Sequence, residues 1–197
     1  MKTFLHVGCG SQNKSRLKGF GTAEWEEIRF DIDPSVAPDI IGTLTDMSGV
    51  QSSSIDAIYS SHNIEHLFPH EVPIALAEFH RILKPDGIVV ITCPDLISVC
   101  RAVIEDRLLE PLYQSPAGPI SPIDILYGHR GFVARGNQYM AHRCGFTYSV
   151  LSGCFFNAGF KKGFGGARPR AFDIWFVATK DERTDDEMQQ LASIFLP

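Results

Sequence analysis

FLHVGCGS (residues 4–11) is the stretch that decides the fold. A short apolar run leads directly into two glycines one residue apart, as at an opening β-strand that ends in a tight loop. Glycine reaches positive φ without a steric clash and lets a ligand lie against the main chain. In an open α/β sheet such a loop stands at the carboxyl end of its strand, where ligands bind. Because the third glycine of the dinucleotide fingerprint is missing, an ordinary turn remains the alternative.

The composition is that of a single soluble globular domain spanning residues 1–197. Hydrophobic residues make up 44% of the chain and charged residues 21%. The net charge of −5 offers no basic surface for nucleic acid. The N-terminus lacks the pattern of a signal peptide, and no apolar run approaches the ~20 residues that span a bilayer. We therefore expect no membrane span and no nucleic-acid partner.

Cysteine usage points to a reducing compartment. The five cysteines are scattered and form no Cys-x-x-Cys pair, so neither a disulfide framework nor a structural zinc site is indicated. A cytoplasmic location fits this pattern best. The cysteines are Cys9, Cys93, Cys100, Cys144 and Cys154.

The first half of the chain alternates strands with connections of uneven length. Apolar runs predict strands at 28–32, 39–41, 55–59 and 88–92 after the opening strand. Residues 69–83 carry apolar side chains at helical spacing. A helix followed by a buried strand predicts a right-handed crossover and a parallel sheet. The connections between the first three strands are too short for full helices, so the early helices should be short or irregular.

Beyond residue 95 the chain is less regular. Residues 110–143 are rich in Pro, Gly, Tyr and His and too long for a plain connection, which is typical of a lid or a binding segment. The other expected elements are helices at 96–109, 146–158 and 181–196, and a hairpin of strands at 161–164 and 171–178 around a turn at 165–169.

Two segments that follow strands are candidates for ligand binding. Asp31 ends the second strand, where an acid accepts hydrogen bonds from ribose hydroxyls in nucleotide-binding folds. The alternative is a local turn in which Asp31 and Asp33 cap backbone amides. Residues 42–47 could wall a flat base, with Leu44 over its face, or could form an ordinary loop.

His62, Glu65 and His66 form a His-x-x-Glu-His motif after the fourth strand. In zinc hydrolases two such histidines bind metal and the glutamate acts as base. That chemistry needs a long helix, whereas here the motif directly follows a strand and is cut off by Pro69. We therefore favour a strand end that places His62 and His66 as polar groups over a ligand, and we expect no metal. A simple capping role is open for either histidine.

Four stretches together resemble the class I S-adenosylmethionine-dependent methyltransferases of the type-11 kind. They are residues 4–10, the strand end at Asp31, residues 54–67 and residues 78–87. The resemblance is close over residues 3–95 and looser through residues 140–147 and the terminal hairpin. It implies an α/β, Rossmann-like, doubly wound sheet of seven strands in the order 3-2-1-4-5-7-6, with strand 7 antiparallel, and here with shortened early helices.

The same resemblance implies which residues bind the cofactor, S-adenosylmethionine. They are Gly8, Cys9 and Gly10 beneath its methionine and ribose portions, Asp31 at the ribose hydroxyls, Ile32 and Leu44 at the adenine, and Ser61 and His62 near the methionyl group. Two positions depart from the family pattern. His6 stands where an acid is common, and Thr43 replaces the usual acid of the adenine loop. Asp46 either compensates for Thr43 or caps the local backbone.

The activity that the resemblance implies is methyl transfer to a small-molecule acceptor by direct in-line displacement. An oxygen or nitrogen acceptor that loses a proton needs a nearby base. His66 and His142 are the candidate catalytic residues, ahead of His129, although structural roles are equally open to them. His142 ends the segment 110–143, which we expect to cover the acceptor.

Aromatic side chains could line that cover, or could simply pack at the ends of loops. They are Tyr127, Phe132, Tyr139 and Tyr148. Because of the changes at His6 and Thr43, a degenerate cofactor-binding domain without transferase activity is the main alternative. A zinc hydrolase is the third.

Overall fold

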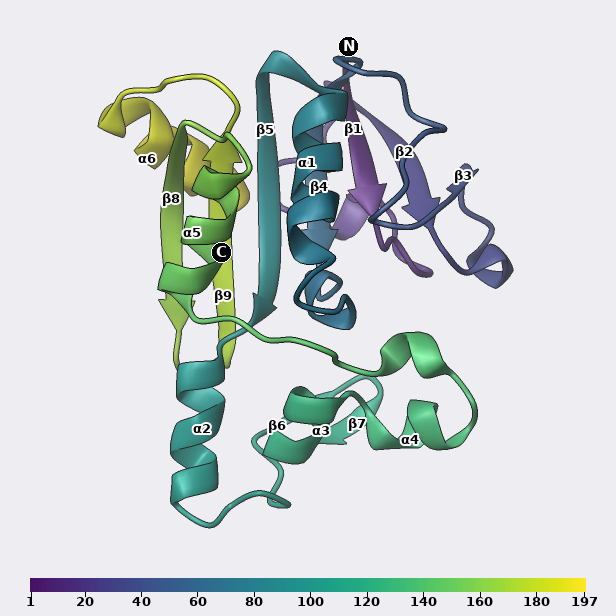
Figure 1. The fold of residues 1–197 in the computed structure, drawn as a ribbon, viewed down its shortest axis with the longest axis vertical. Coiled ribbons are helices and arrows are strands. Elements are labelled where there is room, and N and C mark those ends of the chain that lie inside the picture. Colours follow the sequence, from purple (N-terminus) through teal and green to yellow (C-terminus); the bar gives the residue numbers. More distant parts are fainter.

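A seven-stranded sheet forms the centre of the computed structural model, which describes residues 1–197 (Figure 1). Its strands, in spatial order, are β3 (Ile40–Ile41), β2 (Trp25–Asp31), β1 (Lys2–Val7), β4 (Ile55–Ser61), β5 (Leu83–Pro94), β9 (Asp173–Thr179) and β8 (Lys162–Arg168). The pairs from β3 to β5 are parallel, whereas β9 runs antiparallel to both β5 and β8. With β8 and β9 as the sixth and seventh strands, the predicted order 3-2-1-4-5-7-6 is confirmed.

The early connections are short, as predicted. Between β1 and β2 the chain makes only the 3-10 turn η1 (Lys14–Arg16), and between β2 and β3 only η2 (Pro34–Val36). The turn η3 (Ile64–His66) follows β4 and leads into α1 (Val72–Ile82). Pro73 is tolerated in the first turn of α1, where its missing N–H would have no partner inside the helix. β5 then begins at Leu83, earlier than the sequence predicts.

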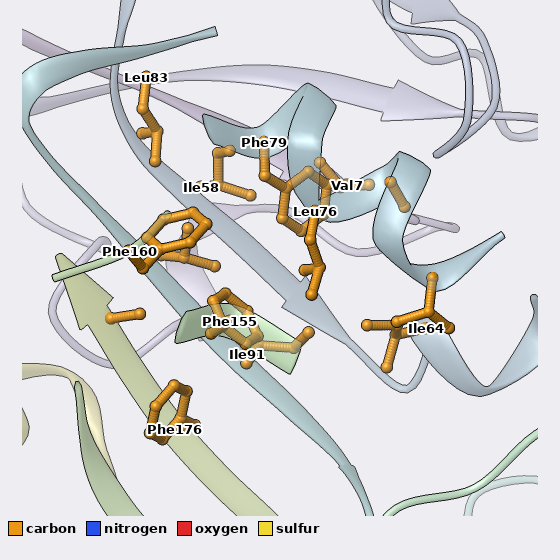
Figure 2. Close-up of a cluster of buried hydrophobic side chains, with 14 of the residues drawn as sticks. Val7, Ile58, Ile64, Leu76, Phe79, Leu83, Ile91, Phe155, Phe160 and Phe176 are labelled. Atoms are coloured by element: carbon orange, nitrogen blue, oxygen red, sulfur yellow. The ribbon is translucent and has the colours of Figure 1, made fainter. Parts of the chain in front are cut away.

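One face of the sheet is covered by α1 and α5 (Tyr148–Asn157), which lie in front of the strands in Figure 1. Apolar side chains from both helices interlock with side chains from the strands, and Figure 2 shows this cluster. Phe79 of α1, Phe155 of α5 and Phe176 of β9 are each fully buried there. Phe155 lies 5.3 Å from Phe176 between ring centroids. This layer holds the main core and packs α1 against the sheet.

The opposite face carries an aromatic cluster under α6 (Asp185–Phe195). Phe20, from the irregular segment before β2, stacks on Phe4 with centroids 4.4 Å apart and contacts Phe195 at 4.7 Å. These aromatic side chains cover this face of the sheet, where the short connection between β1 and β2 contains no α-helix. α6 begins with a capping box between Thr184 and Glu187.

The segment that follows β5 forms a separate layer beneath the carboxyl ends of the parallel strands (Figure 1). Its elements are α2 (Leu96–Ile104), β6 (Tyr113–Ser115), β7 (Gly118–Ile120), α3 (Pro122–Tyr127), α4 (Arg130–Ala134) and η4 (Gln138–Met140). A small core of Val99, Ile120 and Ile125 joins α2, β7 and α3. The expected helix 96–109 is therefore too long, and the expected loop 110–143 has secondary structure of its own.

The terminal hairpin is present, but its predicted turn is misplaced. Residues 165–168 belong to β8, and the chain turns after Arg168. The glycines of β8 serve packing instead, because a Cβ on Gly163 would lie 2.2 Å from the ring of Phe176.

No helix combines the length and the apolar character needed to cross a membrane.

Candidate active site

The loop after β1 and the end of β2 are joined by one carboxylate. Gly10 donates its backbone N–H to Oδ2 of Asp31 at 2.8 Å, and Asp33 donates to Oδ1 at 2.9 Å. Gly8 and Gly10 have φ of 66° and 50°, the left-handed region that favours glycine. Arg29 adds hydrogen bonds to the carbonyls of Gly10 and Val36. These hydrogen bonds fix the conformation of the loop after β1, which no α-helix follows before β2.

Asn63 packs against the glycine loop from the end of β4. A Cβ on Gly8 would lie 2.4 Å from Nδ2 of Asn63, so only glycine allows this approach. Nδ2 is buried and has no hydrogen-bond partner. Across the site, Oδ1 of Asn137 is also buried and without a partner. Buried polar atoms of native proteins are normally paired, so both amides are placed for a polar ligand.

A cavity of about 400 Å³ opens at the carboxyl ends of the parallel strands. This volume lies within the range typical of small-molecule and cofactor sites. One wall comes from the strand ends and the loops after them. The other comes from the segment before α5, through Asn137, Tyr139, Met140 and Arg143.

Most of the predicted cofactor-binding residues line this cavity. They are Gly8, Gly10, Asp31, Ile32, Leu44 and His62, joined by the predicted catalytic residue His66. Cys9 lies close by, but its side chain is buried away from the cavity. Ser61 does not line it, and exposed Asp46 accepts a hydrogen bond from the Ser48 N–H, the capping role foreseen as its alternative.

His6, at the position where the family often has an acid, points away from the cavity. Its side chain is buried, and Nδ1 lies 2.7 Å from Oε1 of Glu27. Burial lowers the pKa of His6 despite the opposing effect of Glu27. The second oxygen of Glu27 accepts the backbone N–H of Lys14. His6 and Glu27 thus tie β1 and β2 to the irregular first connection.

Glu65, His66 and His142 come together at the edge of the cavity. One potential ligand atom from each lies within 4.8 Å of the other two. Arg143 and Cys144 donate backbone N–H groups to the Glu65 carbonyl at 2.9 and 3.2 Å, which docks the end of the inserted segment onto η3. The sequence motif names Glu65 and His66, but nothing local in the sequence shows that His142 joins them.

The charge state of this cluster follows from its surroundings. Burial raises the pKa of the Glu65 carboxyl, but the nearby His62, His66 and His142 outweigh it, so the pKa is lowered. Burial lowers the pKa of His142. The His62 side chain is half-exposed, and the Glu65 carboxylate raises the pKa of His62 against the opposing effect of desolvation.

The zinc-hydrolase arrangement is not formed. η3 is a single 3-10 turn, so His62 and His66 do not stand one turn apart on a long helix. His62 does not belong to the cluster. Of the four aromatic residues considered as lining, only Tyr139 faces the cavity, whereas Tyr148 packs on Phe176 with centroids 5.9 Å apart.

The sheet order and the position of the cavity define a Rossmann-like α/β domain of the methyltransferase class. Residues 5–91 match the family model described as "Methyltransferase domain". The predicted resemblance is thus confirmed, and with it the cofactor that the family implies, S-adenosylmethionine. No curated protein is similar enough in sequence to count as a relative.

Solved structures with the same fold include proteins of differing size. The PH0226 protein from Pyrococcus horikoshii OT3 aligns with a TM-score of 0.60 at 12% identity, over 91% of this chain and 82% of that protein. The 1,6-didemethyltoxoflavin-N1-methyltransferase of Burkholderia thailandensis, a complex with S-adenosylhomocysteine, aligns with a TM-score of 0.56 at 15% identity, over 91% and 71%.

Other similar structures are much longer. The chain spans 47% of the CMeT domain of the citrinin polyketide synthase, which aligns with a TM-score of 0.56 at 15% identity over 92% of this chain. It spans 49% of the CurJ carbon methyltransferase. At these identities the likeness establishes the fold.

Proposed function

We propose that the chain uses S-adenosylmethionine to methylate a small-molecule acceptor by direct in-line displacement. The observation that carries this proposal is the single cavity shared by the glycine loop, Asp31 and the inserted segment. A site for two ligands needs walls from two parts of the chain. Here the strand ends would serve the cofactor, and Tyr139, Met140 and Arg143 would serve the acceptor.

The residues around the glycine loop fit the cofactor. The Asp31 carboxylate, fixed by two backbone donors, lies in the cavity wall and has lone pairs left for ribose hydroxyls. Ile32 and Leu44 supply apolar surface beside it for a flat base. The unpartnered Nδ2 of Asn63 supplies a donor for a carboxylate at the other end. A Cβ at Gly10 would meet no protein atom within 4 Å, so the main chain there is open to a ligand.

Bound S-adenosylmethionine supplies an electrophilic methyl group on a positively charged sulfur. The chain's own contribution is to hold the acceptor in line and to exclude water, and positioning of this kind can supply ~7–11 kcal/mol. Residues 110–143 are proposed to cover the acceptor. Arg143, whose guanidinium lies 4.7 Å from the Phe68 ring centroid, would anchor the rim of that cover.

His66 and His142 are proposed to receive the acceptor's proton. His66 lines the cavity, and His142 stacks edge-on against it with ring centroids 4.8 Å apart. The Glu65 carboxylate behind them would stabilise a positive charge on either ring. His129 is set aside from this role, because its ring accepts the Phe132 N–H at the start of α4.

Calorimetry with S-adenosylmethionine and S-adenosylhomocysteine tests the cofactor site, and we expect saturable binding of both. Transfer is tested with methyl-labelled cofactor and a metabolite extract divided by size, where the label should appear in the fraction below about 1 kDa. Binding without any label transfer would favour the degenerate domain. Label confined to macromolecules would overturn the small-molecule acceptor, and absence of binding would overturn the proposal itself.

A further inference from the structure

Glu65 is a buried carboxylate that lacks a hydrogen bond. It is 1% exposed, and neither of its side-chain oxygens has a hydrogen-bond partner. The nearest ion-pair partner is Nδ1 of His62, 3.4 Å from Oε1 and outside hydrogen-bond geometry. A carboxylate removed from water is stable only when a cation or several donors compensate its charge. None of the surrounding side chains donates a hydrogen bond to either oxygen, although three histidines stand nearby.

His66 and His142 are held so that one nitrogen of each stays free. Nδ1 of His66 lies 3.1 Å from the Ala141 carbonyl oxygen, and Nδ1 of His142 lies 2.6 Å from that of Ile125. A carbonyl only accepts, so Nδ1 carries the proton in both rings and Nε2 keeps a lone pair. This is the arrangement that orients metal-binding histidines, whose other nitrogen donates to a backbone carbonyl.

The three side chains are close enough to share one ion. One ligand atom from each lies within 4.8 Å of the others. Ligand atoms at about 2.1 Å from a tetrahedral ion stand roughly 3.4 Å apart. Side-chain rotations that move the ligand atoms by about 1 Å would therefore bring all three to bonding distance of one ion. The backbones are already fixed relative to one another, because Arg143 and Cys144 donate to the Glu65 carbonyl.

We propose that Glu65, His66 and His142 bind a divalent metal ion, and that zinc suits this set of two imidazole nitrogens and one carboxylate oxygen best. The site differs from the zinc-hydrolase motif, because His62 is not a ligand and His142 comes from the inserted segment. It also departs from our sequence-based expectation of no metal. A first-row ion would give the Glu65 carboxylate the direct bonding partner that its two oxygens lack.

Three protein ligands would leave a zinc ion with an open position, and the proposed site adjoins the cavity because His66 lines it. An ion there lowers the pKa of a bound hydroxyl. Resting on the proposed function, this assigns the acceptor to the alcohols, phenols or enols, bound through oxygen. When the metal ion is bound, it would activate the acceptor's hydroxyl, in place of the proton acceptance proposed above for His66 and His142.

Metal binding is tested on tag-free, chelator-treated protein by calorimetry with zinc chloride and by the visible spectrum of added cobalt(II). We expect one zinc ion per chain and the strong absorption of low-coordinate cobalt. Glu65→Gln and His142→Gln should each weaken zinc binding at least tenfold. His70→Gln, an exposed histidine outside the cluster, is the matched control and should match the unchanged protein.

The outcomes separate the site from the function. Absence of saturable zinc binding, or equal affinity in Glu65→Gln and the unchanged protein, overturns the site. Loss of binding with His62→Gln but not with His142→Gln overturns the ligand set. Acetohydroxamate, an oxygen donor, should shift the cobalt spectrum, and an unchanged spectrum overturns the open position. S-adenosylmethionine titrated into the same samples reports on the proposed function separately, because Asp31 and not Glu65 would hold it.

Discussion

Gly10 and Asp31 are joined by a 2.8 Å hydrogen bond from the glycine N–H to the carboxylate, so the two strand ends that form the cavity floor are fixed to each other. Their strands are neighbours in the sheet and parallel, which brings their carboxyl ends to the same edge. Asp31 therefore has a structural role, and it also lines the cavity. The local-turn role considered from the sequence is real, since Asp33 donates to the same side chain.

Replacing Asp31 with alanine should weaken S-adenosylmethionine binding at least tenfold. The change removes a carboxylate from the cavity and releases the Gly10 N–H, so the loop loses its orientation as well as its acceptor. Calorimetry gives the dissociation constant. Asp46→Ala is the matched control, because Asp46 is exposed, caps Ser48 and stands outside the cavity. An unchanged affinity in Asp31→Ala, or an equal loss in Asp46→Ala, would contradict the assignment.

Alanine at Gly8 should destabilise the protein more than alanine at Gly10. Both residues have left-handed backbone, which costs a residue with a Cβ roughly 1–2 kcal/mol. At Gly8 the new methyl group must also displace Asn63, which adds about 1–3 kcal/mol, whereas at Gly10 it meets open space. Urea unfolding gives both free energies. Equal losses would show that Asn63 moves freely, and Gly10→Ala should still weaken cofactor binding.

Much of the fold was predictable because its signals are local. The apolar run before Gly8, the periodicity of α1 and the buried stretch of β5 each carry their period in a few residues. The turn of the terminal hairpin was not, since Gly165 is required by its approach to β9. A Cβ there would lie 2.0 Å from the Trp175 carbonyl oxygen, a contact between strands that no local pattern records.

The candidate site also combines residues that local sequence signals predict with residues that depend on distant contacts. Gly10, Asp31 and Leu44 follow strands directly, so strand order alone brings them to one cavity. His142 is 76 residues beyond His66, and its place beside Glu65 depends on how the inserted segment folds. Composition described that segment only as rich in Pro, Gly, Tyr and His and too long for a plain connection. α3 holds His142 in place, because the His142 N–H donates to the Tyr127 carbonyl and its Nδ1 lies 2.6 Å from the Ile125 carbonyl oxygen.

The stability of the protein should fall as the pH is lowered from about 8 to 5. Burial lowers the pKa of His6 in the folded state, so the unfolded state binds more protons, and acid favours unfolding. The loss begins near pH 6.5, the usual pKa of histidine, and continues to the folded pKa. Burial also lowers the pKa values of His80 and His142, whereas that of His62 is raised.

His6→Gln isolates the contribution of His6, because glutamine offers a donor to Glu27 but does not titrate. Urea unfolding at several pH values should give a shallower decline for this variant than for the unchanged protein. Parallel curves would show that His6 contributes nothing to the pH dependence. His70→Gln, at an exposed position, controls for the loss of a histidine as such.

Thiol reactivity should single out Cys100. It is exposed on α2, whereas burial raises the pKa of Cys9 to about 11 and that of Cys144 to about 12. Burial raises the pKa values of Cys93 and Cys154 as well. The thiolate is the reactive form, so at pH 8 a disulfide reagent such as DTNB should titrate one thiol rapidly in the native protein and five after denaturation. Cys100→Ser should remove the fast phase entirely. A fast equivalent that persists in that variant would mean that the inserted segment opens and exposes Cys144 on the timescale of the reaction.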